Sequence, residues 1–240
     1  MPAVAFSALR LDAHDVERVA GFWAEVLGWE RRPRPDGSVV VAPGSGAGYP
    51  VVVGAAHTPK AGQNRIHLDL TTDSAAAQEE LVRRVLALGG SHADVGQAGD
   101  EGHVVLADPE GNELCVIEPR NAFLAGTGTV GAVNCDGSQA VGYFWSAVLG
   151  WPLVWDQDEE TAIQSPAGGS KITWSGPPLL PRLGRDRWRF ELRALDDLAG
   201  AVADLVAAGA TVIDALAADR AVLLDPDGNE FHVVAGRLGA

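Results

Sequence analysis

The sequence predicts an α+β protein made of four β-α-β-β-β units, because its turn motifs and its helix motifs occur twice. The hexapeptide Asp-Pro-Glu-Gly-Asn-Glu at 108–113 returns at 225–230 with an aspartate in place of the first glutamate. Its proline presets φ for a tight reversal, and its glycine accepts a left-handed conformation. Apolar residues flank both copies, so each copy predicts a β-hairpin.

The repeat extends well beyond the hairpin. Residues 22–29, Phe-Trp-Ala-Glu-Val-Leu-Gly-Trp, return in similar form at 144–151, and Arg-Ile-His-Leu-Asp-Leu at 65–70 returns as Arg-Trp-Arg-Phe-Glu-Leu at 187–192. Both pairs are shifted by the same number of positions, which indicates a tandem duplication. Each half is long enough to bury its own core. We expect a first domain at 1–120, a linker at 121–127 and a second domain at 128–240.

The first unit begins with a strand at 4–11. Asp15 then starts a helix whose apolar residues keep the i, i+3, i+4, i+7 spacing, and Gly28 ends it. Short valine runs at 39–41 and 51–53 predict two further strands.

The second unit has the same order. A strand at 65–70 leads to a helix that Asp73 or Ser74 caps and that Gly89 ends. The strands of the first hairpin follow at 103–107 and 113–117.

The second half repeats this order. Helices are predicted from Ser138 and from Asp196. The strands before the closing hairpin are predicted at 130–133, 162–164, 171–174 and 188–192.

The composition narrows the class of partner. A formal net charge of −14 argues against nucleic acid and against an anionic membrane, because both attract a basic face. The two cysteines, Cys115 and Cys135, fit neither a disulfide framework nor a zinc-binding spacing, which favours the reducing cytoplasm. No apolar run reaches the length that spans a membrane, and the N-terminus lacks the pattern of a signal peptide. We expect a small-molecule ligand and a monomer or homodimer.

At this point the chain resembles the vicinal-oxygen-chelate superfamily, which includes glyoxalase I, bleomycin-resistance proteins and extradiol dioxygenases. The features that carry the resemblance are the paired βαβββ units, the helix end at 22–29, the strand at 65–70 and the hexapeptide at 108–113. The match covers nearly the whole chain and is closest to the two-domain, actinobacterial glyoxalase-like branch. It implies glyoxalase/bleomycin-resistance-type domains in which mixed sheets curl into half-open cups, with the ligand inside and the helices outside. Since this fold hosts many reactions, it predicts architecture better than activity. The sequence leaves open whether units pair in chain order or the first pairs with the fourth.

Strand alternation assigns residues to the cups. Ile66, Leu68 and Leu70 share one face, so the polar residues between them face the other side. The candidate catalytic residues are therefore Arg65, His67 and Asp69. The same alternation on the other strands, together with tryptophans outside the helix cores, gives the candidate ligand-binding residues Trp29, Glu113, Cys115, Trp155, Trp174, Arg187, Arg189, Glu191 and His232.

The superfamily's metal-dependent members imply where a metal would be held. They carry His, Gln or Glu at the start of each unit's first strand and Glu on the last strand. In this chain those positions fall near Ala8, near Val53, and at Arg65, Cys115, Arg187 and His232. Alanine and valine offer no ligand atom and arginine brings a fixed positive charge. We therefore predict no metal site of the usual kind and no cofactor.

Three functions follow as hypotheses. The first is a binding protein of the bleomycin-resistance type that stacks an aromatic or polycyclic metabolite or antibiotic on its tryptophans. The second is a metal-independent lyase, isomerase or cyclase in which His67 and Asp69 act as acid and base and Arg65 stabilises an oxyanion. The third is a metal-dependent glyoxalase or dioxygenase with displaced ligands, namely His67, Asp69, Cys115 and His103. Whether the protein is an enzyme stays open at this stage.

Overall fold

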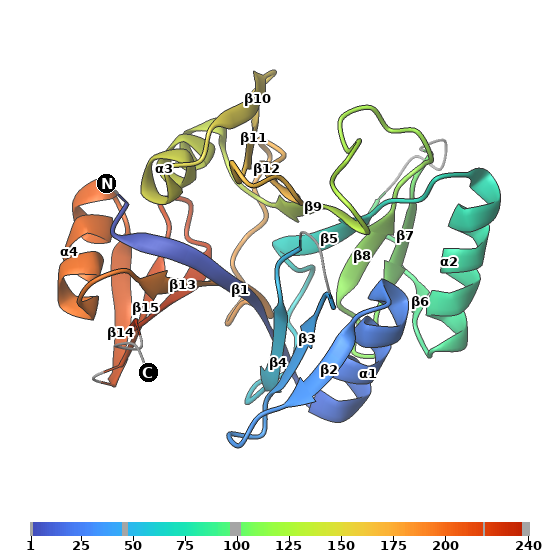
Figure 1. Ribbon diagram of the computed structural model, residues 1–240, viewed down its shortest axis with the longest axis horizontal. Helices are drawn as coiled ribbons and strands as arrows, with labels where there is room; N and C mark the ends of the chain where they lie inside the picture. The colour runs from blue at the N-terminus through green and yellow to red at the C-terminus, as the bar shows by residue number, and fades with distance from the viewer. Residues whose placement is uncertain (1, 45–47, 97–101, 218, 237–240) are drawn as a thin grey trace.

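The computed structural model describes residues 2–44, 48–96, 102–217 and 219–236. These residues form four helices and two mixed eight-stranded sheets, and neither sheet closes on itself (Figure 1). None of the helices in the described ranges is both long and apolar enough to cross a membrane. The α+β class and the four βαβββ units of the sequence analysis are confirmed.

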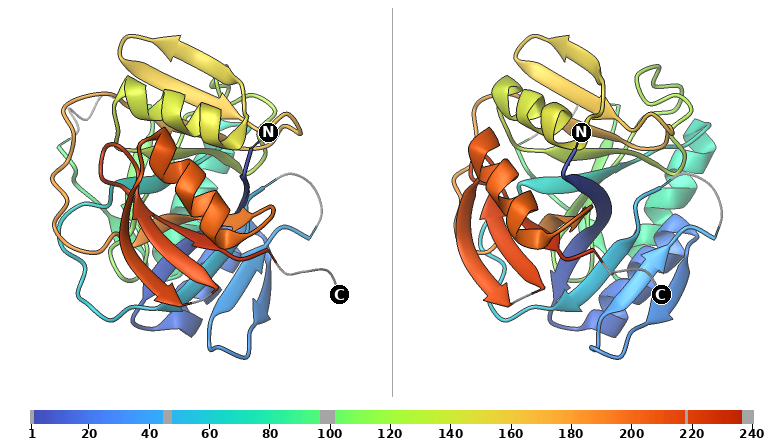
Figure 2. Two further views of the ribbon diagram at one scale, coloured as in Figure 1. Left: turned by 90° about the vertical axis from the view of Figure 1, so that its left-hand side faces the viewer. Right: turned by 60° about the vertical axis from the view of Figure 1, so that its left-hand side comes forward.

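The first sheet, called sheet A, joins the first and the fourth unit. Its centre is β1 (Val4–Ala13), which pairs antiparallel with β13 (Trp188–Ala194) and parallel with β4 (Val51–Ala55). In Figure 2 the dark blue β1 lies beside the orange-red strands of the C-terminal unit. The remaining strands of sheet A are β2 (Glu30–Pro33), β3 (Val39–Ala42), β14 (Thr211–Ala217), β15 (Arg220–Leu224) and β16 (Glu230–Val234).

The second sheet, called sheet B, joins the second and the third unit. Its centre is the antiparallel pair of β5 (Ile66–Leu70) and β9 (Val130–Cys135). Parallel neighbours flank this pair, β8 (Glu113–Val116) beside β5 and β12 (Lys171–Trp174) beside β9. The remaining strands of sheet B are β6 (Ser91–His92), β7 (Val104–Ala107), β10 (Leu153–Gln157) and β11 (Glu160–Gln164).

This arrangement answers the pairing question that the sequence left open. Units from the two halves of the chain pair with each other in both sheets, the first with the fourth and the second with the third. A division at 121–127 therefore describes the duplicated sequence, while each sheet draws strands from both of its halves. The structure also adds edge strands that the sequence analysis did not assign: β2, β6, β10 and β14.

The four helices are α1 (Val16–Leu27), α2 (Ala75–Ala87), α3 (Gln139–Leu149) and α4 (Leu198–Ala208). Asp15, Ser74 and Asp197 each accept a backbone N–H of the first turn and so cap the helix that follows. Gly28 ends α1 in the left-handed conformation at a φ of 68°, as its place in the sequence predicted.

The two repeated motifs are joined to each other by hydrogen bonds in the core. Trp23 of α1 donates its indole N–H to Asp108 at 3.1 Å, and Trp145 of α3 donates to Asp225 at 3.0 Å. Each aspartate opens one of the two hexapeptide turns, whose glycines Gly111 and Gly228 have φ values of 82° and 84°. The repeated helix of one unit is thereby fixed to the repeated hairpin of the next unit along the chain.

The hydrophobic core is continuous between the two sheets. Trp23 packs edge-to-face on Trp188 of β13 with ring centroids 5.3 Å apart, and Trp145 packs on Phe231 of β16 at 5.0 Å. Along the strands, the apolar residues that fill this core alternate with polar residues. The polar side chains therefore lie on the opposite face of each sheet.

Candidate functional site

Polar side chains of four neighbouring strands share the inner face of sheet B. His67 and Asp69 alternate with apolar residues on β5, and the register places Asp69 opposite Cys115 of β8 and His67 opposite Asn134 of β9. Asn134 is in turn opposite Thr173 of β12. The predicted period of two is thus correct for β5 and β8, and it brings these groups together at the centre of the sheet.

Three of them form a compact cluster, which we call the His67 cluster: His67, Asp69 and Cys115. One potential ligand atom from each lies within 4.8 Å of the others. The His67 Nε2 atom is 3.3 Å from Asp69 Oδ1, a buried atom that has no other polar partner among the described residues. The cluster therefore contains a polar atom that is still available to a proton, a ligand or a cation.

The protonation of His67 follows from this contact. Burial alone would lower the pKa of His67, but the contacts with Asp69 and Cys115 outweigh it and raise the pKa to about 10. At neutral pH the ring is then an imidazolium. It can supply a positive charge or a proton, so in this state it fits the acid of the acid–base pair that the sequence predicts for His67 and Asp69.

A cavity of about 380 Å³ opens over this part of sheet B. Asp69 connects the His67 cluster to it, because Asp69 belongs to its lining. The aromatic part of the lining is formed by Trp155 of β10, Trp174 of β12 and Phe123. Phe123 and Trp155 meet edge-to-face with ring centroids 5.7 Å apart, and Trp155 is 37% exposed. The cavity therefore has a polar floor and an aromatic rim, as small-molecule sites commonly do.

Phe123 belongs to the segment that the sequence analysis treated as a linker. Lys171 of β12 holds this segment in place, since its ammonium donates to the Phe123 carbonyl oxygen and lies 3.9 Å from the centroid of the Phe123 ring. Asn121 and Leu124 of the same segment also line the cavity. The connection between the two halves is thus one wall of the candidate site.

The chain matches the glyoxalase-like domain family twice, over residues 8–117 and 131–234. The protein is a member of this glyoxalase-like family. The vicinal-oxygen-chelate resemblance is thereby confirmed, and both copies of the duplicated sequence belong to the match.

Solved structures agree with this assignment of fold. Glyoxalase I from Zea mays is similar with a TM-score of 0.63 at 13% identity, over 97% of this chain and 92% of that chain. A candidate dioxygenase from Bacillus subtilis is similar with a TM-score of 0.56 at 16% identity, over 99% of this chain and 87% of that chain. No curated protein matches the sequence significantly. At these identities the likeness concerns the fold, and the chemistry has to be argued from the residues.

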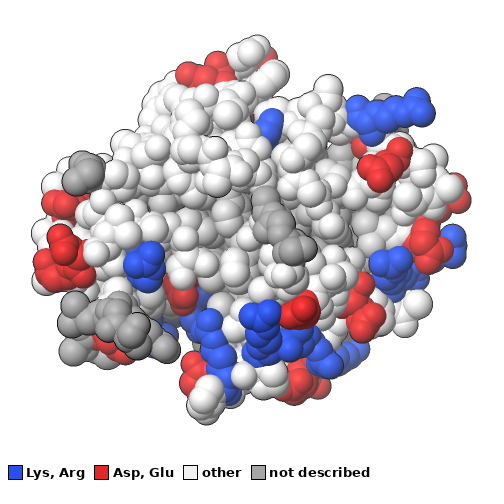
Figure 3. Space-filling view, in the orientation of Figure 1, with Lys and Arg blue, Asp and Glu red and all other residues white. Residues whose placement is uncertain are grey.

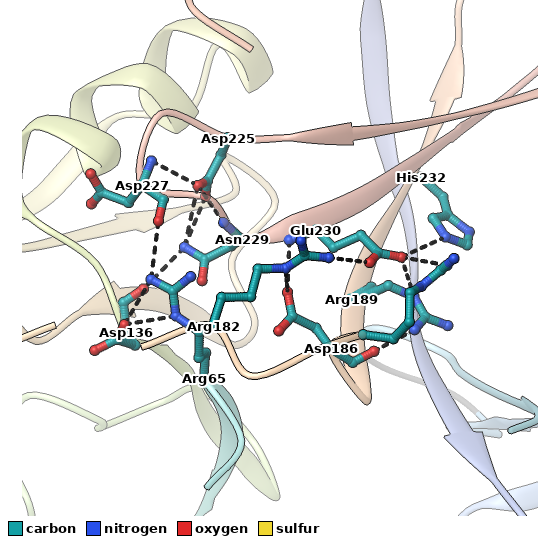
Figure 4. Close-up of polar contacts among 11 residues, drawn as sticks. Arg65, Asp136, Arg182, Asp186, Arg189, Asp225, Asp227, Asn229, Glu230 and His232 are labelled. Atoms are coloured by element: carbon teal, nitrogen blue, oxygen red, sulfur yellow. Dashed lines mark hydrogen bonds and ion pairs between the residues drawn. The ribbon is translucent and has the colours of Figure 1, made fainter. Parts of the chain in front are cut away.

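Some of the site residues predicted from the sequence of this glyoxalase-like protein do not lie at this cavity. Arg65 lies outside its lining: its guanidinium pairs with Asp136 at 2.8 Å and donates to the Asp227 carbonyl oxygen at 3.1 Å (Figure 4). The predicted oxyanion role of Arg65 is therefore not supported by its position. The contact of Arg65 with Asp227 instead connects the start of β5 to the turn between β15 and β16 of sheet A.

Two further candidates have structural partners. Glu113 accepts the Lys60 ammonium at 2.8 Å and the Asn64 backbone N–H at 3.2 Å. Trp29 is half-buried and packs against the hydrophobic core. Neither residue belongs to the lining of the sheet B cavity.

The inner face of sheet A is occupied by ion pairs. Arg10 of β1 pairs with Glu191 of β13 at 2.7 Å, and Arg189 pairs with Asp12 across the same two strands. Arg187 donates to the carbonyl oxygen of Asp12 at 3.0 Å. The candidates Arg187, Arg189 and Glu191 are thus buried and used within the protein.

Glu230 and His232 of β16 complete this set (Figure 4). Glu230 accepts Arg182 at 2.8 Å and Arg185 at 2.6 Å, and the His232 Nε2 atom lies 3.6 Å from it. Burial lowers the pKa of His232, and the neighbouring Arg189 acts in the same direction against the opposing effect of Glu230. His232 is therefore predominantly neutral at neutral pH and enclosed by these charges.

The positions that the superfamily uses for a metal are divided between the two sheets. Ala8, Val53, Arg187 and His232 lie on or beside strands of sheet A, with Val53 in the core, whereas Arg65 and Cys115 lie on or beside strands of sheet B. These six residues therefore do not form one site. Among the described residues the His67 cluster fits a cation, since histidine, carboxylate and thiolate are all ligands of zinc.

Several lining residues were missed by the sequence analysis. Asn134 and Thr173 could have been found, because each alternates with core residues on its strand. Glu118 and Glu160 lie at strand ends, and Phe123 lies in a glycine-rich connection, where no periodicity marks them.

Proposed function

We propose that this glyoxalase-like protein binds a flat aromatic small molecule in the sheet B cavity, as a binding protein of the bleomycin-resistance type. The observation that carries the proposal is the exposed ring of Trp155 beside a cavity of about 380 Å³ whose lining also includes Phe123 and Trp174. Flat rings at a concave surface gain from stacking on a flat ligand. The volume is in the range of small-molecule sites, roughly 300–1,000 Å³.

The occupied face of sheet A supports the choice of cavity. A ligand there would have to displace the part-buried pairs Arg10–Glu191 and Arg189–Asp12, in each of which one partner is buried. Separating such pairs leaves charges buried without partners, at a cost of about 3–5 kcal/mol. We therefore expect one binding site per chain, in sheet B.

The first prediction concerns Trp155. Replacing Trp155 with leucine should weaken binding of the ligand about tenfold or more, because it removes a stacking surface that the fold itself uses little. The measurement is isothermal titration calorimetry with quinoline as a flat aromatic probe.

The matched control is Trp29→Leu. Trp29 is a half-buried tryptophan outside the cavity lining, so its replacement should leave the affinity unchanged. Equal losses in the two variants would mean that the change is a general effect on stability, and no loss in the Trp155 variant would contradict the proposed site.

The state of the recovered ligand separates binding from catalysis. Mass spectrometry of a compound incubated with the protein should return it unchanged if the protein only binds it. A compound returned in altered form would instead favour the lyase or isomerase hypothesis, in which the imidazolium of His67 is the proton donor and Asp69 is its partner.

A metal-dependent enzyme is a second candidate, which the His67 cluster favours. Histidine, aspartate and cysteine would supply three ligands to a divalent cation such as zinc. A bound cation would polarise an oxygen of the substrate. The protein's own contribution would be to orient the three ligands from adjacent strands and to place them beside the lined cavity through Asp69.

Cobalt substitution tests this second candidate without an activity assay. If the cluster binds metal, Co²⁺ should give a thiolate-to-metal absorption band that disappears in Cys115→Ser. Cys135→Ser is the matched control, because Cys135 is a buried cysteine outside the cluster. Absence of the band in the wild-type protein at saturating Co²⁺ would eliminate a thiolate-bound metal and leave the binding function.

A further inference from the structure

The charge of the sheet B cavity adds information about the ligand. Three carboxylates line it, those of Asp69, Glu118 and Glu160, and its other ionisable lining group is His103. Among the described residues of the lining there is no lysine or arginine. The cavity therefore favours a positive ligand over a negative one, and the net charge of −14 attracts such a ligand from a distance.

The internal partners of these carboxylates leave the balance negative. Asp69 is offset by the imidazolium of His67, and among the described residues Glu118 accepts a neutral amide, that of Asn121, at 2.7 Å. Glu160 is exposed at the start of β11. Two carboxylates thus lack a cationic partner in the ion pairs formed by the described residues.

Asp69 adds to this indication. The residue is 8% exposed, it belongs to the lining, and its Oδ1 atom, which lies 3.3 Å from His67 Nε2, has no other polar partner among the described residues. A buried acceptor of this kind is stabilised by a donor from a ligand. A cationic N–H group would satisfy it better than a neutral one.

The aromatic rings of the lining also suit a cation. The faces of tryptophan and phenylalanine attract positive charge within about 6 Å of the ring centre. The protein itself places one cation on this wall, since the Lys171 ammonium lies 3.9 Å from the Phe123 ring. Lys171 donates to the Phe123 carbonyl oxygen, and Trp174 is only 1% exposed, so the ring that remains for a ligand is that of Trp155.

Resting on the proposed aromatic binding function, we infer that the ligand class is the flat organic cation: an aromatic ring system that carries a protonated or quaternary nitrogen. Its rings stack at Trp155, and its charge faces the carboxylates of Glu118 and Glu160. The same carboxylates repel an anionic ligand.

Three bicyclic probes test the charge preference at one ring size. They are 1-methylquinolinium as the cation, quinoline at pH 8 as the neutral compound and quinoline-2-carboxylate as the anion, each titrated to millimolar concentration against tryptophan fluorescence. The cation should bind about tenfold more tightly than quinoline. Its affinity should also fall as the salt concentration rises, whereas that of quinoline should not.

Variants of the lining identify which carboxylates attract the cation. Glu160→Gln and Glu118→Gln should each weaken the cation several-fold and leave quinoline unchanged, while Glu79→Gln, which removes an exposed carboxylate of α2, should change neither. Equal or tighter binding of quinoline or of the anion overturns the inferred charge and leaves the aromatic binding function intact. Binding of none of the three probes overturns both.

Discussion

Replacing Glu230 with glutamine should lower the free energy of unfolding by about 3–5 kcal/mol, the range for breaking a buried ion pair from one side. The Glu230 side chain is fully buried, and Arg189, whose side chain is only 2% exposed, lies 3.6 Å from it. Glutamine would leave the guanidinium of Arg189 with one carboxylate partner, Asp12, in place of two. Urea denaturation at pH 7 measures the loss.

The same residue predicts a pH dependence. Burial alone would raise the pKa of Glu230, but the contact with His232 and the charges of Arg189 and Arg185 outweigh it, so the pKa is lowered from the ordinary 4.5. A carboxyl whose pKa is lower in the folded state contributes stability above pH 4.5 and loses that contribution as the pH falls through its folded pKa. The wild-type protein should therefore lose stability below pH 4.5 more steeply than Glu230→Gln does.

Glu79→Gln is again the matched control, because it removes an exposed carboxylate and should change stability by less than about 0.5 kcal/mol. A loss below about 1 kcal/mol in Glu230→Gln would contradict this prediction. It would show that water around the exposed arginines Arg182 and Arg185 weakens the ion pairs of Glu230. At temperatures where the variant is folded, ligand binding in sheet B should be unchanged, since Glu230 lies on sheet A.

One face of the molecule carries charged side chains of both signs. In Figure 3 lysine, arginine, aspartate and glutamate side chains alternate along the lower edge of the molecule, while the upper central part of this face is nearly free of them. Mixed charge of this kind adds little net attraction for a polyanion.

The local structure, namely the strands with the faces of their residues and the repeated units, was the most predictable part of this protein. The period of two placed His67, Asp69 and Cys115 on one face because apolar neighbours had to meet the core. The repeated motifs likewise fixed the number of units. Neither observation says which units share a sheet, because all four units present similar edges, and the pairing of β1 with β13 depends on contacts far apart in sequence.

Long polar side chains were the least predictable part. Alternation correctly directed Arg189 and Glu191 to the inner face of sheet A, but it could not show that Asp12 and Arg10 would neutralise them there. Phe123 shows the opposite error. A glycine-rich stretch indicates a loop, yet only the packing of Lys171 on Phe123 makes that loop a wall of the cavity.

The second large effect is expected at the repeated hexapeptide. Replacing Asp108 with alanine should lower the free energy of unfolding by about 3–5 kcal/mol, because several buried donors would lose their acceptor at about 1–3 kcal/mol each. Asp108 accepts the backbone N–H groups of Glu110 and Asn112 at 2.8 and 2.9 Å. It also accepts the Asn112 amide at 2.8 Å and the Trp23 indole N–H at 3.1 Å.

Asp36→Ala is the control for this prediction. Asp36 also accepts hydrogen bonds within a turn, from the backbone and hydroxyl of Ser38, but it is exposed. Water can replace it, so its removal should cost about 1 kcal/mol or less. Similar losses in the two variants would show that the hexapeptide acts as an ordinary surface turn.

A double-mutant cycle isolates the contact between the two repeated motifs. Trp23→Phe removes the indole donor and keeps an aromatic ring in the core, and combined with Asp108→Ala it should cost less than the sum of the two single changes by about 1–2 kcal/mol. The same coupling is expected for Trp145 and Asp225. Because each pair joins a helix of one unit to the hairpin of the next, additive losses would mean that the duplicated motifs stabilise their own units separately. Coupled losses would mean that the hydrogen bond between the two motifs stabilises the packing of adjacent units, and with it the packing of the two sheets.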